Sequence, residues 1–248
     1  MAGKENESIQ DALPNELIML LSSLAQKWGD TLDPSIKTAK HLSGAMTNAV
    51  YAVSWPAKEG TVTRRVLVRI YGKGIHNFFD RDDEVRIFEF VSNNGHGPSL
   101  LEKGKEGRIE EFIDAKTLSA SDQRDPEIST LIAKKLREFH TIELPGTKEP
   151  AIWGRLRKWL EKAKGLCSTE RIEELGDLEE EINLLEDELS REEQEIVFCH
   201  NDLQNGNIMI KDKTITLINT PKPHLNPLHW FQEFQRDIKK RYLLSLKP

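Results

Sequence analysis

A histidine, an aspartate and an asparagine lie close together in the segment FCHNDLQNGNIMI, at the spacing His-x-Asp-x-x-x-x-Asn. This spacing is typical of a phosphoryl-transfer loop, in which the aspartate accepts a hydroxyl proton and the asparagine holds magnesium against nucleotide phosphates. Asp202 and Asn207 fill these two positions. Because phosphoryl transfer depends mainly on positioning and charge stabilisation, we expect His200 to brace the loop by hydrogen bonds rather than to act as the base.

Short apolar runs on both sides of the loop predict the strands that would position it. Residues 196–199 enter the loop and residues 208–210 leave it. A polar turn then leads into a second apolar run at 214–218, which predicts a hairpin. We expect Gln204 to point into the site from within the loop. At the end of such a hairpin a kinase-like enzyme carries a second metal-binding carboxylate, and this chain has Asn219 there.

Three upstream features are candidates for binding a nucleotide. The segment LSGAMTN, with Ser43, Gly44 and Asn48, precedes a predicted strand where a phosphate-covering loop would lie, although a single glycine there also fits an ordinary turn. Arg69, near the end of an apolar strand, could meet phosphates or point to water. Glu84, on the following helix, could orient that cation as in protein kinases, or lie on a solvated helix face.

The order of predicted elements indicates an α+β fold in which a strand-rich lobe precedes a helical lobe, as in bilobal protein-kinase-like proteins. Apolar periodicity predicts helices at 13–28, 80–91 and 126–140, and strands at 49–53, 65–71 and 109–113. We expect a nucleotide-binding lobe over 1–113, a partial catalytic lobe over 114–218 and a tail over 219–248. In the tail, Trp230, Phe231, Phe234 and Ile238 fit one face of a terminal helix.

The acidic segment 153–195 is helical in propensity and carries one apolar stripe. Leu178, Ile182, Leu185 and Leu189 recur at helical spacing. The pattern predicts a solvated helix with that stripe buried, and a partner-binding coil is the alternative.

Composition restricts the class of protein. The 248 residues are 38% hydrophobic and 31% charged, with a net charge of -6, so a nucleic-acid partner is not indicated. No apolar run approaches the roughly 20 residues of a spanning helix. The N-terminus lacks the basic and apolar regions of a secretory signal, so we expect a cytoplasmic protein. Cys167 and Cys199 form no metal-ligand pattern, and we expect Cys199 to be strand packing.

Several blocks of the sequence resemble the choline/ethanolamine kinase family, in particular its plant choline kinases. The similar blocks appear in the expected order and cover about residues 15 to 218. They are LSGAMTNAVYAVSWP, RVLVRIYGKG, RDDEVRIFEF, GHGPSLL, GRIEEFIDAKTLSASDQRDPEISTLIAKKLREFH and FCHNDLQNGNIMI. The resemblance implies a protein-kinase-like fold and the ATP- and magnesium-dependent phosphorylation of choline, the entry step to phosphatidylcholine, with ethanolamine as the nearest rival substrate.

The resemblance also assigns roles to individual residues. It implies that the loop with Ser43, Gly44 and Asn48 contacts the nucleotide phosphates together with Arg69, which should pair with Glu84. It implies that Glu111 and Ile113 touch adenine through backbone groups. Asp202 corresponds to the catalytic base and Asn207 to a magnesium ligand. Because the family commonly dimerises, a homodimer is expected.

The chain departs from the family pattern in two ways. Asn205 stands where plant members usually carry an aromatic residue. Where the family continues with LIDYEY and a long C-terminal lobe, this chain reads LINTPKPH, so that Asn219 replaces a metal-binding aspartate and the aromatic cage for choline is missing. A neutral amide oxygen binds magnesium less strongly than a carboxylate. The alternatives are therefore a catalytically impaired, C-terminally truncated isoform that binds nucleotide or a full-length subunit, and, less favoured, a protein or aminoglycoside kinase.

Overall fold

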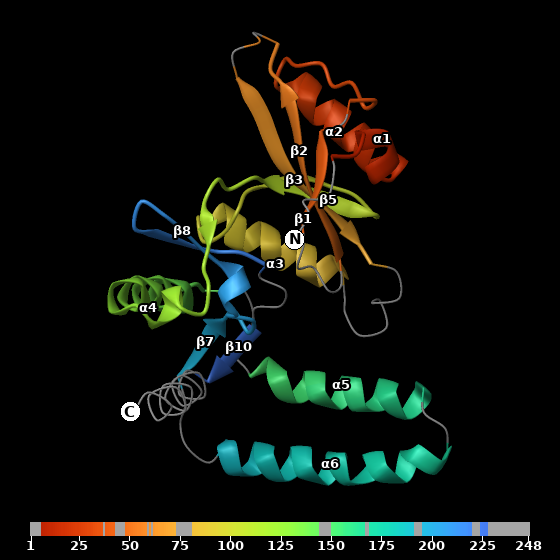
Figure 1. Ribbon diagram of the computed structural model, residues 1–248. Coiled ribbons are helices and arrows are strands. Elements are labelled where there is room, and N and C mark those ends of the chain that lie inside the picture. Colours follow the sequence, from red (N-terminus) through yellow and green to blue (C-terminus); the bar gives the residue numbers. More distant parts are fainter. Residues whose placement is uncertain are drawn as a thin grey trace. The chain divides into compact units, whose positions relative to one another are not determined.

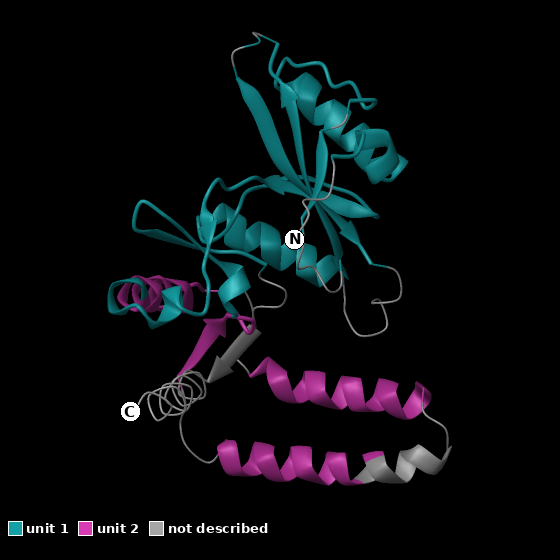
Figure 2. Cartoon of the chain, in the orientation of Figure 1, with its two compact units in different colours: residues 1–128, 204–219 teal, residues 129–203, 220–248 magenta. Residues whose placement is uncertain are grey.

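The computed structural model describes residues 6–36, 38–42, 48–58, 60, 62–72, 81–143, 150–166, 169–190, 195–219 and 224–227. They divide into two compact units, one of residues 1–128 and 204–219, the other of residues 129–203 and 220–248 (Figure 2). The sequence predicted parts that each form one unbroken stretch of the chain, with boundaries at residues 113 and 218. The units differ from it because residues 204–219 join the first unit through strand pairing.

The first unit contains a five-stranded antiparallel sheet in the order β1-β2-β3-β5-β4 (Figure 1). The strands are β1 (Ala39–Leu42), β2 (Asn48–Pro56), β3 (Thr63–Tyr71), β4 (Leu100–Lys103) and β5 (Gly107–Glu111). The helices are α1 (Ile9–Ala12), α2 (Asn15–Lys27) and α3 (Arg81–Asn93). The predicted helices and strands of this region are confirmed, whereas the short edge strands β1 and β4 were not predicted.

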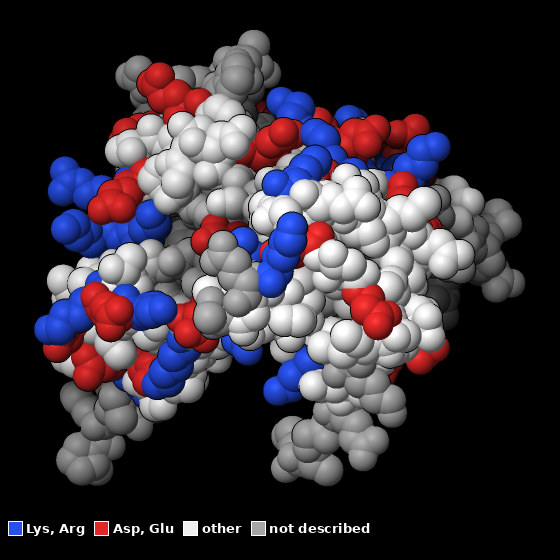
Figure 3. Space-filling view, turned by 90° about the horizontal axis from the view of Figure 1, so that it is seen from above, with Lys and Arg blue, Asp and Glu red and all other residues white. Residues whose placement is uncertain are grey.

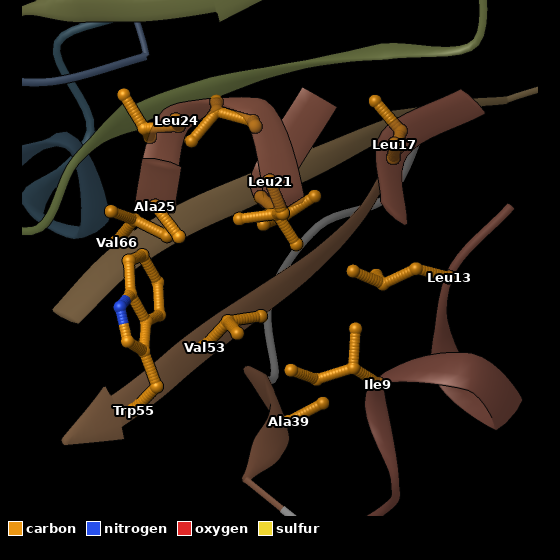
Figure 4. Close-up of a cluster of buried hydrophobic side chains, with 12 residues drawn as sticks. Ile9, Leu13, Leu17, Leu21, Leu24, Ala25, Ala39, Val53, Trp55 and Val66 are labelled. Carbon is orange, nitrogen blue, oxygen red and sulfur yellow. The ribbon is translucent and has the colours of Figure 1, made fainter. Parts of the chain in front are cut away.

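Side chains that alternate along the strands give the sheet two different faces. One face meets α1 and α2 in an apolar core that includes Val66 of β3 (Figure 4). Val68 of β3 and Ile109 of β5 belong to the same core. Leu17 and Leu21 of α2 are fully buried in this core. The intervening strand residues therefore point to the opposite side, and these include Arg69.

Replacing Leu21 by alanine should lower the free energy of unfolding by about 2–5 kcal/mol, because the cavity forms inside a core whose elements are fixed by the sheet. Leu21 is 0% exposed. The matched control is Met19→Ala in the same helix, at a side chain that is 66% exposed, where a change within about 0.5 kcal/mol is expected. Urea denaturation measures both. Equal effects of the two substitutions would contradict this description of the core.

A smaller three-stranded sheet carries the segment after the catalytic loop. It consists of β6 (Lys116–Thr117), β8 (Ile208–Lys211) and β9 (Thr214–Leu217), with β8 in the middle. The predicted hairpin is confirmed. Its two turn residues, Asp212 and Lys213, have φ values of 48° and 63°, the pair of positive values that a type I′ hairpin turn requires.

The second unit consists mainly of helices. Its described elements are α4 (Pro126–His140), which begins in the first unit, α5 (Ala151–Leu166), α6 (Thr169–Leu189), β7 (Ile196–Cys199) and β10 (His224–Pro227). Strand β10 pairs antiparallel with β7. The rest of the tail, including the expected helix with Trp230, Phe231, Phe234 and Ile238, lies outside the described residues.

The prediction of a buried stripe on α6 is wrong. Leu178 and Leu185 are 41% and 46% exposed, and no described residue of α6 is buried. The helices α5 and α6 are joined by polar contacts instead, including ion pairs between Arg157 and Glu186 and between Lys164 and Glu179. Of the four residues of the predicted stripe, Leu178 and Leu185 are thus exposed, whereas Ile182 and Leu189 are half-buried.

Charged side chains of both signs are interspersed on the face of the molecule in Figure 3. Among the described residues, no helix combines the length and the apolar character needed to cross a lipid bilayer.

Candidate active site

The predicted base, Asp202, follows a buried strand that fixes the start of its loop. In β7, Phe198 is fully buried and stacks on Phe139 of α4, with ring centroids 5.0 Å apart. Cys199 is also buried, which confirms it as strand packing. Asp202 itself is half-buried. Residues 200–203 therefore leave a rigid strand and present a carboxylate that is partly open to solvent.

His200 holds the backbone of this loop. Its side chain is fully buried, its ring lies 5.7 Å from the Phe139 ring, and its Nδ1 accepts a hydrogen bond of 3.3 Å from the Asp202 backbone N–H. An imidazole nitrogen that accepts a hydrogen bond carries no proton. This contact is the one expected of a bracing residue, because His200 holds the backbone of Asp202 and not its carboxylate.

The second half of the loop belongs to the first unit and forms a 3-10 turn at Asn205–Asn207. The Asn207 N–H donates to the Gln204 carbonyl over 2.9 Å, while the Gln204 side chain is exposed. Asn205, which departs from the family pattern, donates from Nδ2 to the Leu118 carbonyl over 3.1 Å. The side-chain amide makes this anchoring bond, which gives Asn205 a structural role at the edge of the loop.

The two predicted metal ligands, Asn207 and Asn219, are hydrogen-bonded to each other. Asn207 is 2% exposed, and its Oδ1 accepts from Asn219 Nδ2 over 3.0 Å. Asn219 Oδ1 in turn accepts from Arg69 Nη2. We call this set of three side chains, Arg69, Asn219 and Asn207, the amide relay. Asn219 adopts a φ of 53°, in the left-handed region that asparagine tolerates better than most residues.

The expected pairing of Arg69 with Glu84 is wrong. Arg69 Nε donates to Glu110 Oε1 over 2.8 Å, and Arg108 Nε donates to the same oxygen over 2.8 Å. Glu84 instead accepts from Arg108 over 3.0 Å and from Arg81 over 2.7 Å. The strand register explains the difference, because Arg69 lies opposite Arg108 in the sheet and thus diagonally from Glu110.

These buried charges determine the ionisation of the cluster. Burial alone would raise the pKa of Glu110, but the adjacent guanidinium groups of Arg69 and Arg108 outweigh it and hold the pKa of that carboxyl below its usual value. For Arg108, burial disfavours the charged form, but Glu110 and other neighbours raise its pKa above the usual value. The Arg108 guanidinium also lies 4.2 Å from the centre of the Phe88 ring. The Glu110 carboxyl and the Arg108 guanidinium are therefore both charged at neutral pH.

Sequence reasoning missed Arg108 and Glu110. A signal was present, because the segment GRIEE alternates around Ile109, which points into the apolar core. Period-2 alternation then directs both neighbours of Ile109 to the face that carries Arg69.

The predicted nucleotide-binding residues are distributed as follows. Ser43 and Gly44 lie outside the described residues. Asn48 opens β2, and its Oδ1 accepts from the Gly72 N–H over 3.4 Å. Glu111 ends β5, where its N–H donates to the Ser99 carbonyl over 2.9 Å, and the Ile113 carbonyl accepts from Ala115 over 3.0 Å. Arg69 is only 7% exposed, so the interpretation as a solvent-facing strand end is wrong.

The amide relay does not fit a magnesium ion. Arg69 can only donate hydrogen bonds, so the Asn219 oxygen must face it and the Asn219 NH₂ must face Asn207. Magnesium requires oxygen ligands, whereas Asn219 presents N–H groups toward Asn207. The described residues also contain no cluster of three or more histidine, cysteine, aspartate or glutamate side chains suited to a metal.

The antiparallel sheet with its covering helices, followed by a loop with Asp202 and Asn207 between two strands, is the arrangement of a protein-kinase-like fold. A choline kinase from Cryptosporidium parvum Iowa II has a similar structure, with a TM-score of 0.62 and 26% identity over 86% of this chain and 66% of that chain. The chain belongs to the choline/ethanolamine kinase family, whose pattern matches residues 39–219. This membership sets aside the protein-kinase and aminoglycoside-kinase alternatives.

Curated relatives support the same family and the resemblance to plant choline kinases. The chain is 52% identical over 226 residues to probable choline kinase 3 of Arabidopsis thaliana, covering 89% of this chain and 65% of the relative. It is 35% identical over 205 residues to the probable ethanolamine kinase of Arabidopsis thaliana, covering 79% and 54%. The chain thus spans less than two thirds of the length of these relatives.

Proposed function

We propose that this chain is a choline-kinase-type phosphotransferase whose acceptor is choline and whose donor is ATP. The observation that carries the proposal is the position of Asp202 within the family match, at the end of a buried strand and with its backbone fixed by His200. The similarity to probable choline kinase 3 of Arabidopsis thaliana favours choline over ethanolamine, because the identity to the probable ethanolamine kinase is lower. The product would be phosphocholine, for phosphatidylcholine synthesis.

In this mechanism Asp202 acts on the acceptor and other residues hold the donor. The half-exposed Asp202 carboxylate would accept the proton of the choline hydroxyl as that oxygen attacks the terminal phosphate. His200 would keep the loop in place without exchanging a proton, since its Nδ1 is occupied by the Asp202 N–H. Gln204, which is exposed, would line the acceptor side.

The nucleotide would be held by the first unit. Glu111 and Ile113 would meet adenine through backbone groups, and the loop with Ser43, Gly44 and Asn48 would cover the phosphates. The magnesium ion that normally accompanies ATP finds no suitable ligand pair in the amide relay. We further propose a cytoplasmic location and pairing with a second subunit of the same family.

Phosphocholine formation tests the proposal directly. The purified chain is incubated with ATP, magnesium and choline, and phosphocholine is quantified by ³¹P NMR beside an Asp202→Ala chain. Turnover above that of the substituted chain supports the enzyme. Turnover equal to it would refute an active kinase. Ethanolamine in parallel reactions measures the acceptor preference.

A second candidate function is binding of nucleotide without turnover, alone or beside a full-length subunit. The amide relay favours it, because Asn219 and Asn207 are engaged with each other where a kinase needs metal ligands. A thermal-shift titration with ATP tests this candidate, because a ligand that binds only the folded state raises the apparent stability of the protein. A rise without phosphocholine formation would support this candidate, and no rise would refute it.

A further inference from the structure

The amide relay connects parts of the first unit that are far apart in the sequence. Arg69 lies in β3, Asn219 follows β9, and Asn207 ends the 3-10 turn before β8. The Arg69 to Asn219 bond spans 150 positions. Within the described residues, these two hydrogen bonds tie the sheet to the end of the catalytic loop.

The orientation of the Asn219 amide is fixed from both sides. If the amide were reversed, its NH₂ group would face the Arg69 guanidinium and its oxygen would face the Asn207 oxygen, which replaces two hydrogen bonds by two repulsive contacts. A guanidinium has donors only. Asn207 Oδ1, the atom expected to bind a metal, therefore has one lone pair committed to an N–H at 3.0 Å.

The charges around the relay also disfavour a cation. Arg69 and Arg108 share the single carboxylate of Glu110, and Glu84 lies between Arg108 and Arg81. The cluster thus contains three guanidinium groups and only two carboxylates, so it carries one excess positive charge. An aspartate in place of Asn219 would neutralise this excess, but asparagine does not. A divalent cation beside the cluster would meet net repulsion.

We propose that the amide relay takes the place of a bound metal in this chain, so that Asn207 and Asn219 hold no Mg²⁺. This inference concerns metal binding alone and stands or falls independently of choline phosphorylation.

Titration with Mn²⁺ as a magnesium substitute, followed by electron paramagnetic resonance of the free ion, tests the proposal. The unsubstituted chain should bind Mn²⁺ no more tightly than an Asn207→Ala chain, because any remaining binding comes from the acidic surface. Asn219→Asp removes the N–H that faces Asn207 and adds a carboxylate. It should therefore raise the affinity for one ion by about tenfold or more.

Asn183→Asp is the matched control for that substitution. Asn183 Oδ1 also accepts from an arginine, Arg157 Nη2, over 2.8 Å, so the change adds the same charge beside a guanidinium without a second amide. It should leave Mn²⁺ affinity unchanged. An Asn219→Asp chain that binds no more tightly than the control would overturn the proposal.

If Asn219→Asp fails to fold, the comparison between the unsubstituted chain and Asn207→Ala still tests the proposal. A tenfold loss of Mn²⁺ affinity on going from the unsubstituted chain to Asn207→Ala would show that Asn207 already holds a metal, and would overturn the proposal. Equal affinities of these two chains support it.

Discussion

Replacing Glu110 by glutamine should lower the free energy of unfolding by about 3–5 kcal/mol, because the substitution leaves two buried guanidinium groups without their shared carboxylate. The Glu110 side chain is 3% exposed, and those of Arg69 and Arg108 are 8% and 2% exposed. Water therefore cannot replace the lost charge. Urea denaturation at neutral pH measures the change.

Glu127→Gln is the control for this substitution. Glu127 forms an ion pair of 2.6 Å with Lys213, but the two side chains are 64% and 78% exposed. Exposed pairs contribute about 0–1 kcal/mol. The same chemical change should thus have a small effect here. If Glu110→Gln were as mild as Glu127→Gln, the description of Glu110 as the centre of a buried ionic cluster would be wrong.

The contribution of Glu110 should depend on pH in a defined direction. The folded state holds the pKa of Glu110 below the usual 4.5 of a glutamic acid, so the unfolded chain takes up the proton first as pH falls. The stabilisation is complete above about pH 4.5 and is lost as the pH falls through the folded pKa. The difference in unfolding free energy between the unsubstituted chain and Glu110→Gln should therefore be constant near neutrality and shrink in acid. A difference that grew in acid would contradict the pKa direction.

The sequence predicted those strands and turns whose residue pattern is complete within a short stretch of the chain. The apolar runs beside the catalytic loop gave β7 and β8, and the polar turn between the two later runs gave the hairpin to β9. The edge strands β1 and β4 have only four residues each, with mixed polarity, and so carry no clear period. The helix α6 was predicted, but its apolar stripe could not reveal that Leu178 and Leu185 would be exposed, because the burial of a stripe depends on which element packs against it.

The contacts of the site depended on tertiary structure. Arg69 was predicted to bind nucleotide phosphates, and its partner was inferred by analogy with kinases in which a helix glutamate meets a strand cation. The sheet register decides otherwise, since it places Glu110 diagonally opposite Arg69, and the two side chains are hydrogen-bonded. The relay from Arg69 through Asn219 could not be read from the sequence, because it joins residues 150 positions apart.

Under the proposed function, Asp202→Asn should reduce phosphocholine formation by about 100-fold or more, because the amide cannot accept the hydroxyl proton while it keeps nearly the same shape. The effect should be confined to turnover. Asp202 belongs to the second unit, whereas Arg69, Glu110 and the amide relay belong to the first, so stabilisation of the chain by ATP in a thermal-shift titration should persist. Loss of turnover and of ATP binding together would instead indicate damage to the fold.

Asp212→Asn provides the matched control for this substitution. Asp212 is exposed in the hairpin turn with a φ of 48°, a conformation that asparagine also adopts readily. It makes the same change of charge ten positions further along the chain, so a general electrostatic effect would appear in both variants. Full turnover in Asp212→Asn beside lost turnover in Asp202→Asn would assign the effect to the carboxylate that follows β7. Equal loss in both would mean that the negative charge acts at a distance, and that another group accepts the proton.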